Sequence, residues 1–428
     1  MSNKVFAGLL SILVPCMSAM IGSAIADEIF KPTTIITVPG GLKSFDIGFV
    51  DADIHTYVLA DRTNKTIDVV DTRTNTLRQL TANPPFAGVR VHPGAASGPD
   101  GTIIVDHKEV WAGDAPSDCT TFAPFTCTPD STVKVIDLET GATTAVLVTG
   151  GQRRADELCE DVGHEVVLVA NDDPIDSFIT FWSTESHKLL GKISFLSGST
   201  DHNGGVIANG IEQCKYDPRT RKFYLSIPAT FDSTLQNSLP GVVVVISRDA
   251  PFHVEKVIPV DPTCVGPAGL TIGPDHQIAL GCGAGNGPGT GSVIIDDRTG
   301  GTRKKLLNIF GDEIWYNPGD NQYFFTGENT LGVVDPNGNQ DATAATQTGS
   351  HSVAADMLKN QVYVPINSGG GICGATSKTG CIAVYTAEHD DKCLADDMPV
   401  LGHGDSDDPV FMRTRCDRDR RADRDDHR

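Results

Sequence analysis

Long apolar runs are almost missing from this chain of 428 residues. After residue 26, no segment approaches the about 18–20 unbroken apolar residues that a membrane-spanning helix needs, so we expect no membrane span. Basic residues are also scarce, because 34 Lys and Arg stand against 55 Asp and Glu and the formal net charge is −21. Such a charge repels phosphate backbones and anionic lipid heads, which argues against nucleic-acid and membrane-surface partners.

Motifs for common chemistry are missing as well. The chain has no G-x-S-x-G nucleophile elbow, no H-E-x-x-H, no C-x-x-C with zinc spacing and no C-x-x-C-H for haem. The glycine-rich stretch Gly281–Gly291 lies between predicted strands, which is typical of a flexible loop rather than of a phosphate cradle. Helical periodicity is nearly absent over residues 33–388. The sequence therefore predicts an all-β protein.

The first 26 residues have the pattern of a secretory signal peptide. Lys4 precedes an apolar run from Val5 to Ala19, and Ala24 to Ala26 form an A-x-A cleavage site. We expect cleavage after Ala26, which leaves 428 − 26 = 402 residues, and a secreted or periplasmic protein. A lipoprotein anchored at Cys16 is the alternative, but Pro15 stands where a small residue is wanted.

The cysteine count indicates disulfide bonds. Eleven cysteines include Cys16 in the signal segment, and an even number in an exported chain favours disulfides over metal sites. Spacing within loops, or equivalent places in successive repeats, suggests the pairs Cys119–Cys127, Cys373–Cys381 and Cys159–Cys214. The pairs Cys264–Cys282 and Cys393–Cys416 follow only by elimination.

A repeated unit runs through most of the chain. Each unit is a short strand, a polar turn and a β-rich strand, followed by a third strand and often a fourth. The units start at Phe45, Gly98, Arg154, Asn209, Pro267, Gly311 and His351, so the spacings are 53, 56, 55, 58, 44 and 40 residues. About four strands at a period of about 40–50 residues predict a β-propeller, here with seven blades of four antiparallel strands.

The repeat also predicts the domain boundaries. The early strand Thr33–Val38 precedes the first unit and could complete the last blade, which would close the ring. We therefore expect a propeller over residues 27–389 and an extension over 390–428 that ends in a disordered tail of alternating Asp and Arg. A seven-unit β-solenoid is the alternative fold, but solenoid repeats are nearer about 20 residues.

The stretch "YVLADRTNKTIDVVDTRTNTL" resembles the YVTN-type repeat of exported bacterial propellers. Two further stretches, "NGIEQCKYDPRTRKFYLSIP" and "PAGLTIGPDHQIALGCG", are similar to blades of the senescence-marker/gluconolactonase (SMP-30-like) group and of NHL-type propellers. The resemblance covers nearly all of residues 40–388. It implies a propeller scaffold, which recurs across unrelated functions.

Polar residues just before the innermost strand of each blade should gather at one mouth of the central channel. These candidates for a ligand or metal site are Asp46, Asp100, Asp156, Glu157, Asn209, Glu212, Asp312, Glu313 and His351. Crowded carboxylates and an amide suit Ca²⁺ or another divalent cation, and His351 could join for a softer metal. The alternative is a solvated polar mouth in which these acids cap turns or pair with Arg154. The sequence identifies no definite cofactor.

The gluconolactonase resemblance implies a metal held by an early Glu, an Asn in an N-G turn and an Asp in a P-D-G turn. Asn209-Gly210 matches the Asn turn. Ala268 occupies the Asp place, and the first unit offers Asp46 rather than a Glu. Because alanine can neither bind a metal nor act as a base, a lactonase is the weaker hypothesis.

We therefore predict a monomeric propeller of binding or scaffolding type, with a polar site at the channel mouth. Its partner would be a small molecule or a protein. Two insertions, Gly113–Ser131 and Asn367–Cys381, sit between the second and third strands of a blade, each tied by its own disulfide, and they could add binding surface. The alternatives are a calcium-type lactonase or hydrolase at the same mouth and a redox partner protein, although no redox-centre motif is present.

Overall fold

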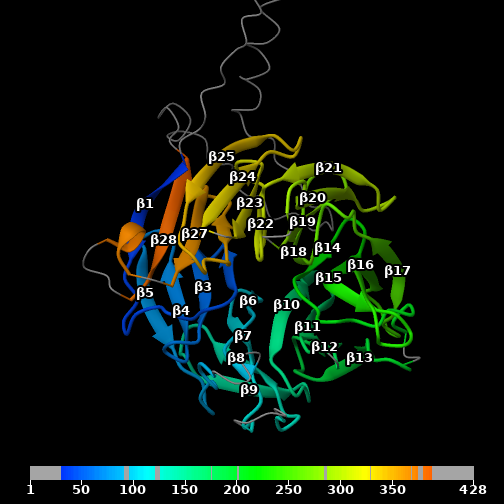
Figure 1. The fold of residues 1–428 in the computed structure, drawn as a ribbon. Coiled ribbons are helices and arrows are strands. Elements are labelled where there is room, and N and C mark those ends of the chain that lie inside the picture. The colour runs from blue at the N-terminus through cyan, green and yellow to red at the C-terminus, as the bar shows by residue number, and fades with distance from the viewer. Residues whose placement is uncertain are drawn as a thin grey trace, which may run out of the picture.

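The computed structural model describes residues 30–387 apart from 91–95, 121–125, 175, 200–201, 284–286, 328, 368 and 375–378. These residues form seven four-stranded antiparallel sheets around a central axis (Figure 1). The predicted seven-bladed all-β propeller is thereby confirmed. The predicted signal segment, the C-terminal extension and the pair Cys393–Cys416 lie outside the described residues.

Each blade is a meander that begins with its innermost strand. Blade 1 contains β2 (Gly48–Asp51), β3 (Thr56–Asp61), β4 (Thr66–Asp71) and β5 (Thr76–Leu80); blade 2 contains β6 (Thr102–Val105), β7 (Glu109–Asp114), β8 (Thr132–Asp137) and β9 (Thr143–Val148). Blade 3 contains β10 (Ala155–Asp161), β11 (Val166–Asn171), β12 (Phe178–Ser183) and β13 (Leu189–Ser194); blade 4 contains β14 (Cys214–Asp217), β15 (Lys222–Phe231), β16 (Ser238–Ser247) and β17 (Val254–Pro259).

The remaining blades follow the same plan. Blade 5 contains β18 (Pro267–Ile272), β19 (Gln277–Cys282), β20 (Gly291–Asp296) and β21 (Thr302–Leu307); blade 6 contains β22 (Ile314–Asn317), β23 (Gln322–Gly327), β24 (Thr330–Val334) and β25 (Gln340–Ala345). Blade 7 contains β26 (Ala354–Asp356), β27 (Gln361–Ile366), β28 (Cys381–Ala387) and β1 (Phe30–Ile36). Two short 3₁₀ helices, Val162–His164 and Gly371–Cys373, are the helices among the described residues. Neither has the length or apolarity that a bilayer crossing requires.

The ring closes where the first strand joins the last blade. β1 pairs antiparallel with β28, from Phe30 opposite Ala387 to Ile36 opposite Ile382. The two ends of the described chain therefore lie in one sheet, and β1 covers the edge that β28 would otherwise expose. This pairing confirms the closing strand, which was predicted a few residues later at Thr33–Val38.

Apolar faces packed between neighbouring blades form the core. Many strands are continuous runs of buried residues rich in β-branched and aromatic side chains. The largest cluster lies between blades 3 and 4, where Phe181 stacks on Phe252 at 3.8 Å between ring centroids. Turns between strands use residues with positive φ, such as Asn75 at 55° and Asn321 at 60°, a conformation that asparagine tolerates.

Four of the predicted disulfides are present, namely Cys119–Cys127, Cys159–Cys214, Cys264–Cys282 and Cys373–Cys381. The bond Cys159–Cys214 joins the innermost strands of blades 3 and 4, so it links two blades directly. Four disulfides fit an oxidising compartment.

The two ends of the ring carry different segments because the strands alternate in direction. The start of every innermost strand and the end of every second strand lie at one end, which we call the mouth face. The turns between first and second strands and between third and fourth strands lie at the other end, the turn face. Both crosslinked insertions connect a second to a third strand, after β7 and after β27, and therefore belong to the mouth face.

Candidate functional site at the channel mouth

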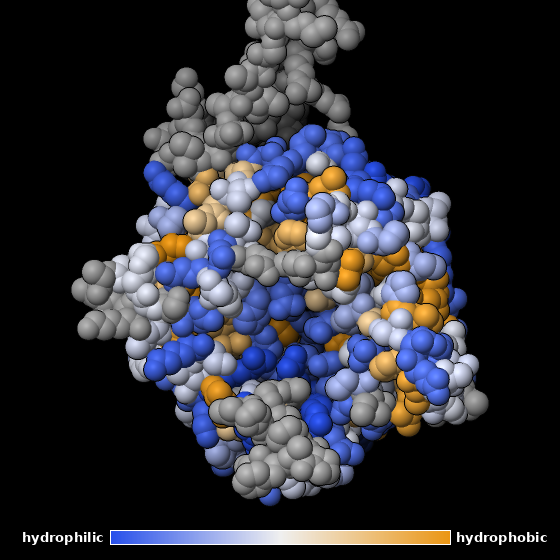
Figure 2. Space-filling view, viewed as in Figure 1, coloured by the Kyte–Doolittle hydropathy of each residue, from blue (hydrophilic) through white to orange (hydrophobic). Residues whose placement is uncertain are grey.

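One residue from each blade forms a ring at the mouth of the channel. Each member of this mouth ring lies near the start of an innermost strand. For example, Asp46 lies five residues before Asp51, the last residue of β2. The mouth ring comprises Asp46, Asp100, Asp156, Glu212, Ala268, Asp312 and His351. Seen along the ring axis, hydrophilic residues gather in a hollow at the centre of the molecule (Figure 2).

A repeated backbone irregularity presents these side chains. The N–H of Asp46 donates to the carbonyl of Ala60, and the N–H of Ala60 donates to the carbonyl of Ile47, so two residues of the inner strand face one residue of its neighbour. Such a bulge redirects side chains at the end of a strand. The same pattern recurs at Asp100 with Gly101, at Glu212 with Gln213 and at Asp312 with Glu313.

Arg62 neutralises the blade 1 and blade 2 members of the ring. It directly follows β3, which ends at the mouth face, and its Nη2 contacts both Asp46 and Asp100. Burial alone would raise the pKa of Asp46, but the charge of Arg62 and a hydrogen bond from His351 hold that pKa well below its usual range. Asp46 is therefore ionised.

Arg154 pairs in the same way with the ring members of blades 2 and 3. Its Nε lies 2.9 Å from Oδ2 of Asp156 and 3.0 Å from Oδ2 of Asp100, and its Nη2 lies 3.8 Å from Oδ2 of Asp172. Burial opposes the positive charge, yet the surrounding carboxylates, Asp156 first, raise the pKa of Arg154 well above its ordinary value. Burial also raises the pKa of Asp156 to about 7, although Arg154 opposes the shift.

His351 contacts oxygen atoms with both of its ring nitrogens. Its Nδ1 lies 2.7 Å from the carbonyl oxygen of Gly349, its Nε2 lies 3.1 Å from Oδ1 of Asp46, and its ring stacks on Phe45 at 4.9 Å. Burial alone would lower the pKa of His351, but the hydrogen bond and the charge of Asp46 raise it. Because both nitrogens face acceptor oxygens, the imidazole donates from both, and neither nitrogen is left for a metal.

The blade 4 and blade 6 members of the ring lack such partners. Glu212 is half-buried and Asp312 is exposed in the mouth, and among the described residues neither carboxyl group has a hydrogen bond or ion pair. Burial raises the pKa of Glu212 well above its ordinary value, and the neighbouring Asp172, Asp156 and Asp312 add to the shift. The guanidinium groups thus sit on the blade 1 to blade 3 side, whereas unpaired carboxyl groups face the opposite side.

A second layer of side chains crosses the axis beneath the ring. Burial, and after it the neighbouring Glu157 of blade 3, raise the pKa of Glu313 of blade 6 well above its ordinary value. Gln213 of blade 4 donates from Nε2 to Oε2 of Glu313 at 2.6 Å, and its Oε1 accepts from the N–H of Leu270 at 2.6 Å. Burial, together with Asp156, raises the pKa of Glu157 to about 8.

Aromatic groups close the layer below. Lys215 lies over the ring of Trp315 at 4.8 Å, and Phe49 packs edge-on against the same ring at 5.7 Å. These three residues come from blades 4, 6 and 1. The mouth is therefore a cup with a floor, in which a ligand would meet carboxyl groups from several blades at once.

Three carboxyl groups approach one another closely enough for a cation. Oxygens of Asp46, Asp100 and Asp156 lie within 4.8 Å of one another, and all three residues are buried. The same oxygens already face Arg62 and Arg154, which supply the positive charge that a metal would bring. Asn209, the remaining predicted residue, stands outside the ring, half-buried, with its N–H donating to the carbonyl of Ala229.

The sequence reasoning missed Arg62, Asp172, Gln213, Lys215 and Trp315. Arg62 and Asp172 follow second strands, which end at the same face where first strands begin. Aligning the residue after each second strand would have found them. The inner strands carry the other three, with Gln213 one place and Lys215 three places after Glu212, and Trp315 three places after Asp312. Nothing in the sequence indicates that these side chains meet across the axis.

The fold and the site together define a seven-bladed β-propeller with a charged, floored channel mouth. No family model matches the chain, and no curated protein sequence matches it. A chain from the crystal structure of a mitotic checkpoint complex is similar with a TM-score of 0.58 and 10% identity, covering 90% of this chain and 100% of that chain. The Neurospora crassa Pan2 WD40 domain is similar with a TM-score of 0.54 and 11% identity, covering 85% of this chain and 97% of that domain.

Identities this low show a shared fold alone. The propeller is confirmed by these neighbours, whereas the resemblance to YVTN-type and gluconolactonase-like propellers stays a sequence-based expectation. Ala268 holds the blade 5 place in the mouth ring, where an acid would be needed for the lactonase ligand set.

Proposed function

We propose that the protein is an exported binding propeller that takes a positively charged ligand in the mouth of its channel. The observation that carries this proposal is the excess of carboxyl groups at the mouth over the cations that the chain itself supplies. Six carboxyl groups belong to Asp46, Asp100, Asp156, Asp172, Glu212 and Asp312, whereas the cations are Arg62, Arg154 and His351.

Geometry favours a ligand on one side of the mouth. The cations pair with the carboxylates of blades 1 to 3, so the carboxyl groups without a cation partner are those of Glu212 and Asp312. A positively charged ligand at these two residues would relieve repulsion between neighbouring carboxyl groups that cannot separate. A concave, low-dielectric mouth also strengthens such attraction relative to an exposed surface.

A resident divalent cation is the second candidate, favoured by the close approach of Asp46, Asp100 and Asp156. Ca²⁺ needs six to eight oxygen ligands at about 2.3–2.6 Å, and the guanidinium groups compete for the same oxygens. The proposal of a charged organic ligand or side chain therefore has the stronger support.

A thermal-shift screen with matched cationic, neutral and anionic small molecules tests the proposal on the purified protein. Cations should raise the melting temperature preferentially, and Glu212→Gln should weaken the effect. Asp249→Asn is the matched control, because Asp249 has a side chain 77% exposed and lies in a turn on the opposite face. Stabilisation that does not depend on ligand charge, or that survives Glu212→Gln unchanged, would contradict the proposal.

A further inference from the structure

A cavity of about 300 Å³ opens beside the mouth ring between blades 5, 6 and 7. Its walls include two ring members, Asp312 and His351, the blade 5 residue Ala268 and the aromatic side chain of Phe310. The lining also includes four glycines, together with Cys282, Thr348 and Ser350; the glycines are Gly283, Gly311, Gly327 and Gly349. The volume is at the lower end of the range for small-molecule sites.

One glycine of the wall stands where no side chain can be accommodated. At Gly349 the backbone φ is +87°, and a Cβ atom there would lie 2.2 Å from Nδ2 of Asn367. Only glycine suits that position, and it sets the course of the segment that leads to Ser350 and His351. This glycine therefore fixes the backbone that carries two other residues of the cavity wall.

A buried hydroxyl group in the wall has no partner. Ser350 is 1% exposed and lines the cavity, and its Oγ makes no hydrogen bond to any described residue. A buried hydroxyl without a partner costs free energy, so native proteins rarely keep one without a reason. A ligand group in the cavity would supply the missing hydrogen bond.

We propose that this cavity binds a small organic ammonium ion, with Asp312 as its counter-ion, Phe310 as its aromatic wall and Ser350 as a hydrogen-bond partner. The inference rests on the proposed function, because the cavity opens from the same mouth. Asp312 is the ring member with an exposed and unpaired carboxyl group, and it contributes to the cavity wall. An ammonium ion needs one carboxylate and gains from an aromatic face, whereas Ca²⁺ needs several oxygens together.

Anionic and neutral ligands fit the cavity less well. An anion would face Asp312 with only His351 as a cation, and both nitrogens of His351 already serve Gly349 and Asp46. A neutral molecule would leave the carboxylate of Asp312 without a counter-charge. The site therefore selects for positive charge within a small volume.

Calorimetry with choline and ethanolamine tests the inference, each compared with a neutral isostere. For choline the isostere carries a tert-butyl group in place of the trimethylammonium group, and for ethanolamine it is ethylene glycol. We expect the ammonium compounds to bind and the isosteres to bind at least about tenfold more weakly. Asp312→Asn should weaken ammonium binding about tenfold or more, and Ser350→Ala roughly two- to fivefold.

Controls separate this inference from the proposed function. Neither variant should lower the melting temperature of the free protein, since Asp312 is unpaired and the Ser350 hydroxyl has no partner, and Asp249→Asn should leave the affinity unchanged. Equal binding of isosteres and ammonium compounds would overturn the inference. So would ammonium binding that is lost in Glu212→Gln but unchanged in Asp312→Asn, although the mouth would then still be a cation site. Absence of any cationic ligand in both experiments would overturn both proposals.

Discussion

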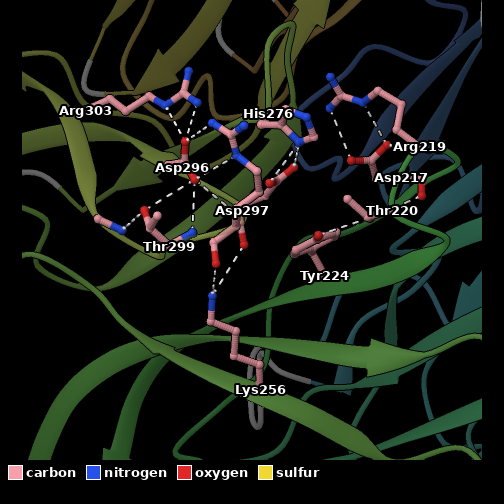
Figure 3. Close-up of polar contacts among 12 residues, drawn as sticks. Asp217, Arg219, Thr220, Tyr224, Lys256, His276, Asp296, Asp297, Thr299 and Arg303 are labelled. Carbon is pink, nitrogen blue, oxygen red and sulfur yellow. Dashed lines mark hydrogen bonds and ion pairs between the residues drawn. The ribbon is translucent and has the colours of Figure 1, made fainter.

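Aspartate is abundant on both faces of the ring, but the partners of its carboxylate differ between the two faces. On the turn face, Asp71, Asp217 and Asp296 each accept a hydrogen bond from the backbone N–H two residues later and pair with the arginine at that position. Figure 3 shows two of these turns, with Arg219 beside Asp217 and Arg303 reaching Asp296 from the next strand. In the mouth, by contrast, Arg62 and Arg154 each pair with a carboxylate of their own blade and with one of a neighbouring blade.

The difference appears in the acidity of the two sets. The hydrogen bond from Arg73 lowers the pKa of Asp71 to about 2, because the turn offers donors to the charged form. In the mouth, burial raises the pKa of Asp156 to about 7 and that of Glu157 to about 8. Turn-face acids thus stabilise the fold as carboxylates, whereas burial in the mouth disfavours the charged form of these acids. Perturbed pKa values of this kind are typical of a binding site.

Removing one arginine from each face should give the largest contrast. Arg154→Met leaves Asp100, Asp156 and Asp172 without their shared cation, and should reduce the free energy of unfolding at pH 7 by roughly 3–5 kcal/mol. Arg298→Met removes an exposed partner of Asp296, and should leave the urea midpoint nearly unchanged. Equilibrium unfolding in urea measures both.

The loss in Arg154→Met should shrink at pH 5, where protonation of the mouth carboxyl groups relieves their repulsion. Similar losses in the two variants, or a loss independent of pH, would show that the two faces do not differ as described.

The contacts within turns could be predicted from the sequence, whereas the contacts between blades could not. Seven repeats, the closing strand, four disulfides and the ring positions follow from turn chemistry and spacing, because each depends on neighbours along the chain or on a constant period. The turn-face pairs are equally visible as Asp-x-Arg, for example at Asp71 and Asp217.

Long-range partners explain what the sequence left open. Arg62 meets Asp100, and Gln213 meets Glu313, only after blades have stacked around an axis. Whether an acid in the ring is paired or free depends on such contacts. The sequence therefore supplied candidate residues, whereas their division into neutralised and unpaired groups required coordinates.

The second largest effect is expected from the buried carboxyl group of Glu157, which should make the stability of the protein depend on pH. Glu157 has a folded pKa of about 8 against an ordinary value of 4.5, so the unfolded chain binds fewer protons between these values and stability falls as pH rises through this range. Glu157→Gln keeps a hydrogen-bonding side chain that does not ionise. The variant should be more stable than the wild type at pH 8, by on the order of 1–2 kcal/mol, and similar at pH 5.

Urea unfolding at both pH values checks the prediction. Glu185→Gln is the control, because Glu185 is exposed in a turn between β12 and β13 on the turn face. An unchanged pH slope in Glu157→Gln would mean that this carboxyl group ionises normally in the folded protein.

The turn face should show the opposite sign and a smaller effect. The pKa of Asp71 is lowered, so its contribution to stability is present above its ordinary value of 3.8 and is lost as pH falls toward about 2. Asp71→Asn should therefore lower the midpoint at pH 6 slightly and flatten its decrease between pH 4 and pH 2.5. Thermal unfolding across this range measures the slope, and a steeper decrease in the variant would refute the assignment.

Calcium should have the smallest effect on the wild-type protein. After treatment with EDTA, added Ca²⁺ should give no binding heat and no rise in melting temperature, because Arg62 and Arg154 occupy the oxygens of Asp46, Asp100 and Asp156. Arg62→Gln removes one of these cations and leaves an amide oxygen beside the three carboxylates. That variant should gain Ca²⁺ binding, with the ion restoring part of its lost stability. Ca²⁺ binding by the wild type would mean that the guanidinium groups move away from the carboxylates when a metal binds. The mouth would then be a metal site, and its arginines would pair with the carboxylates only in the metal-free protein.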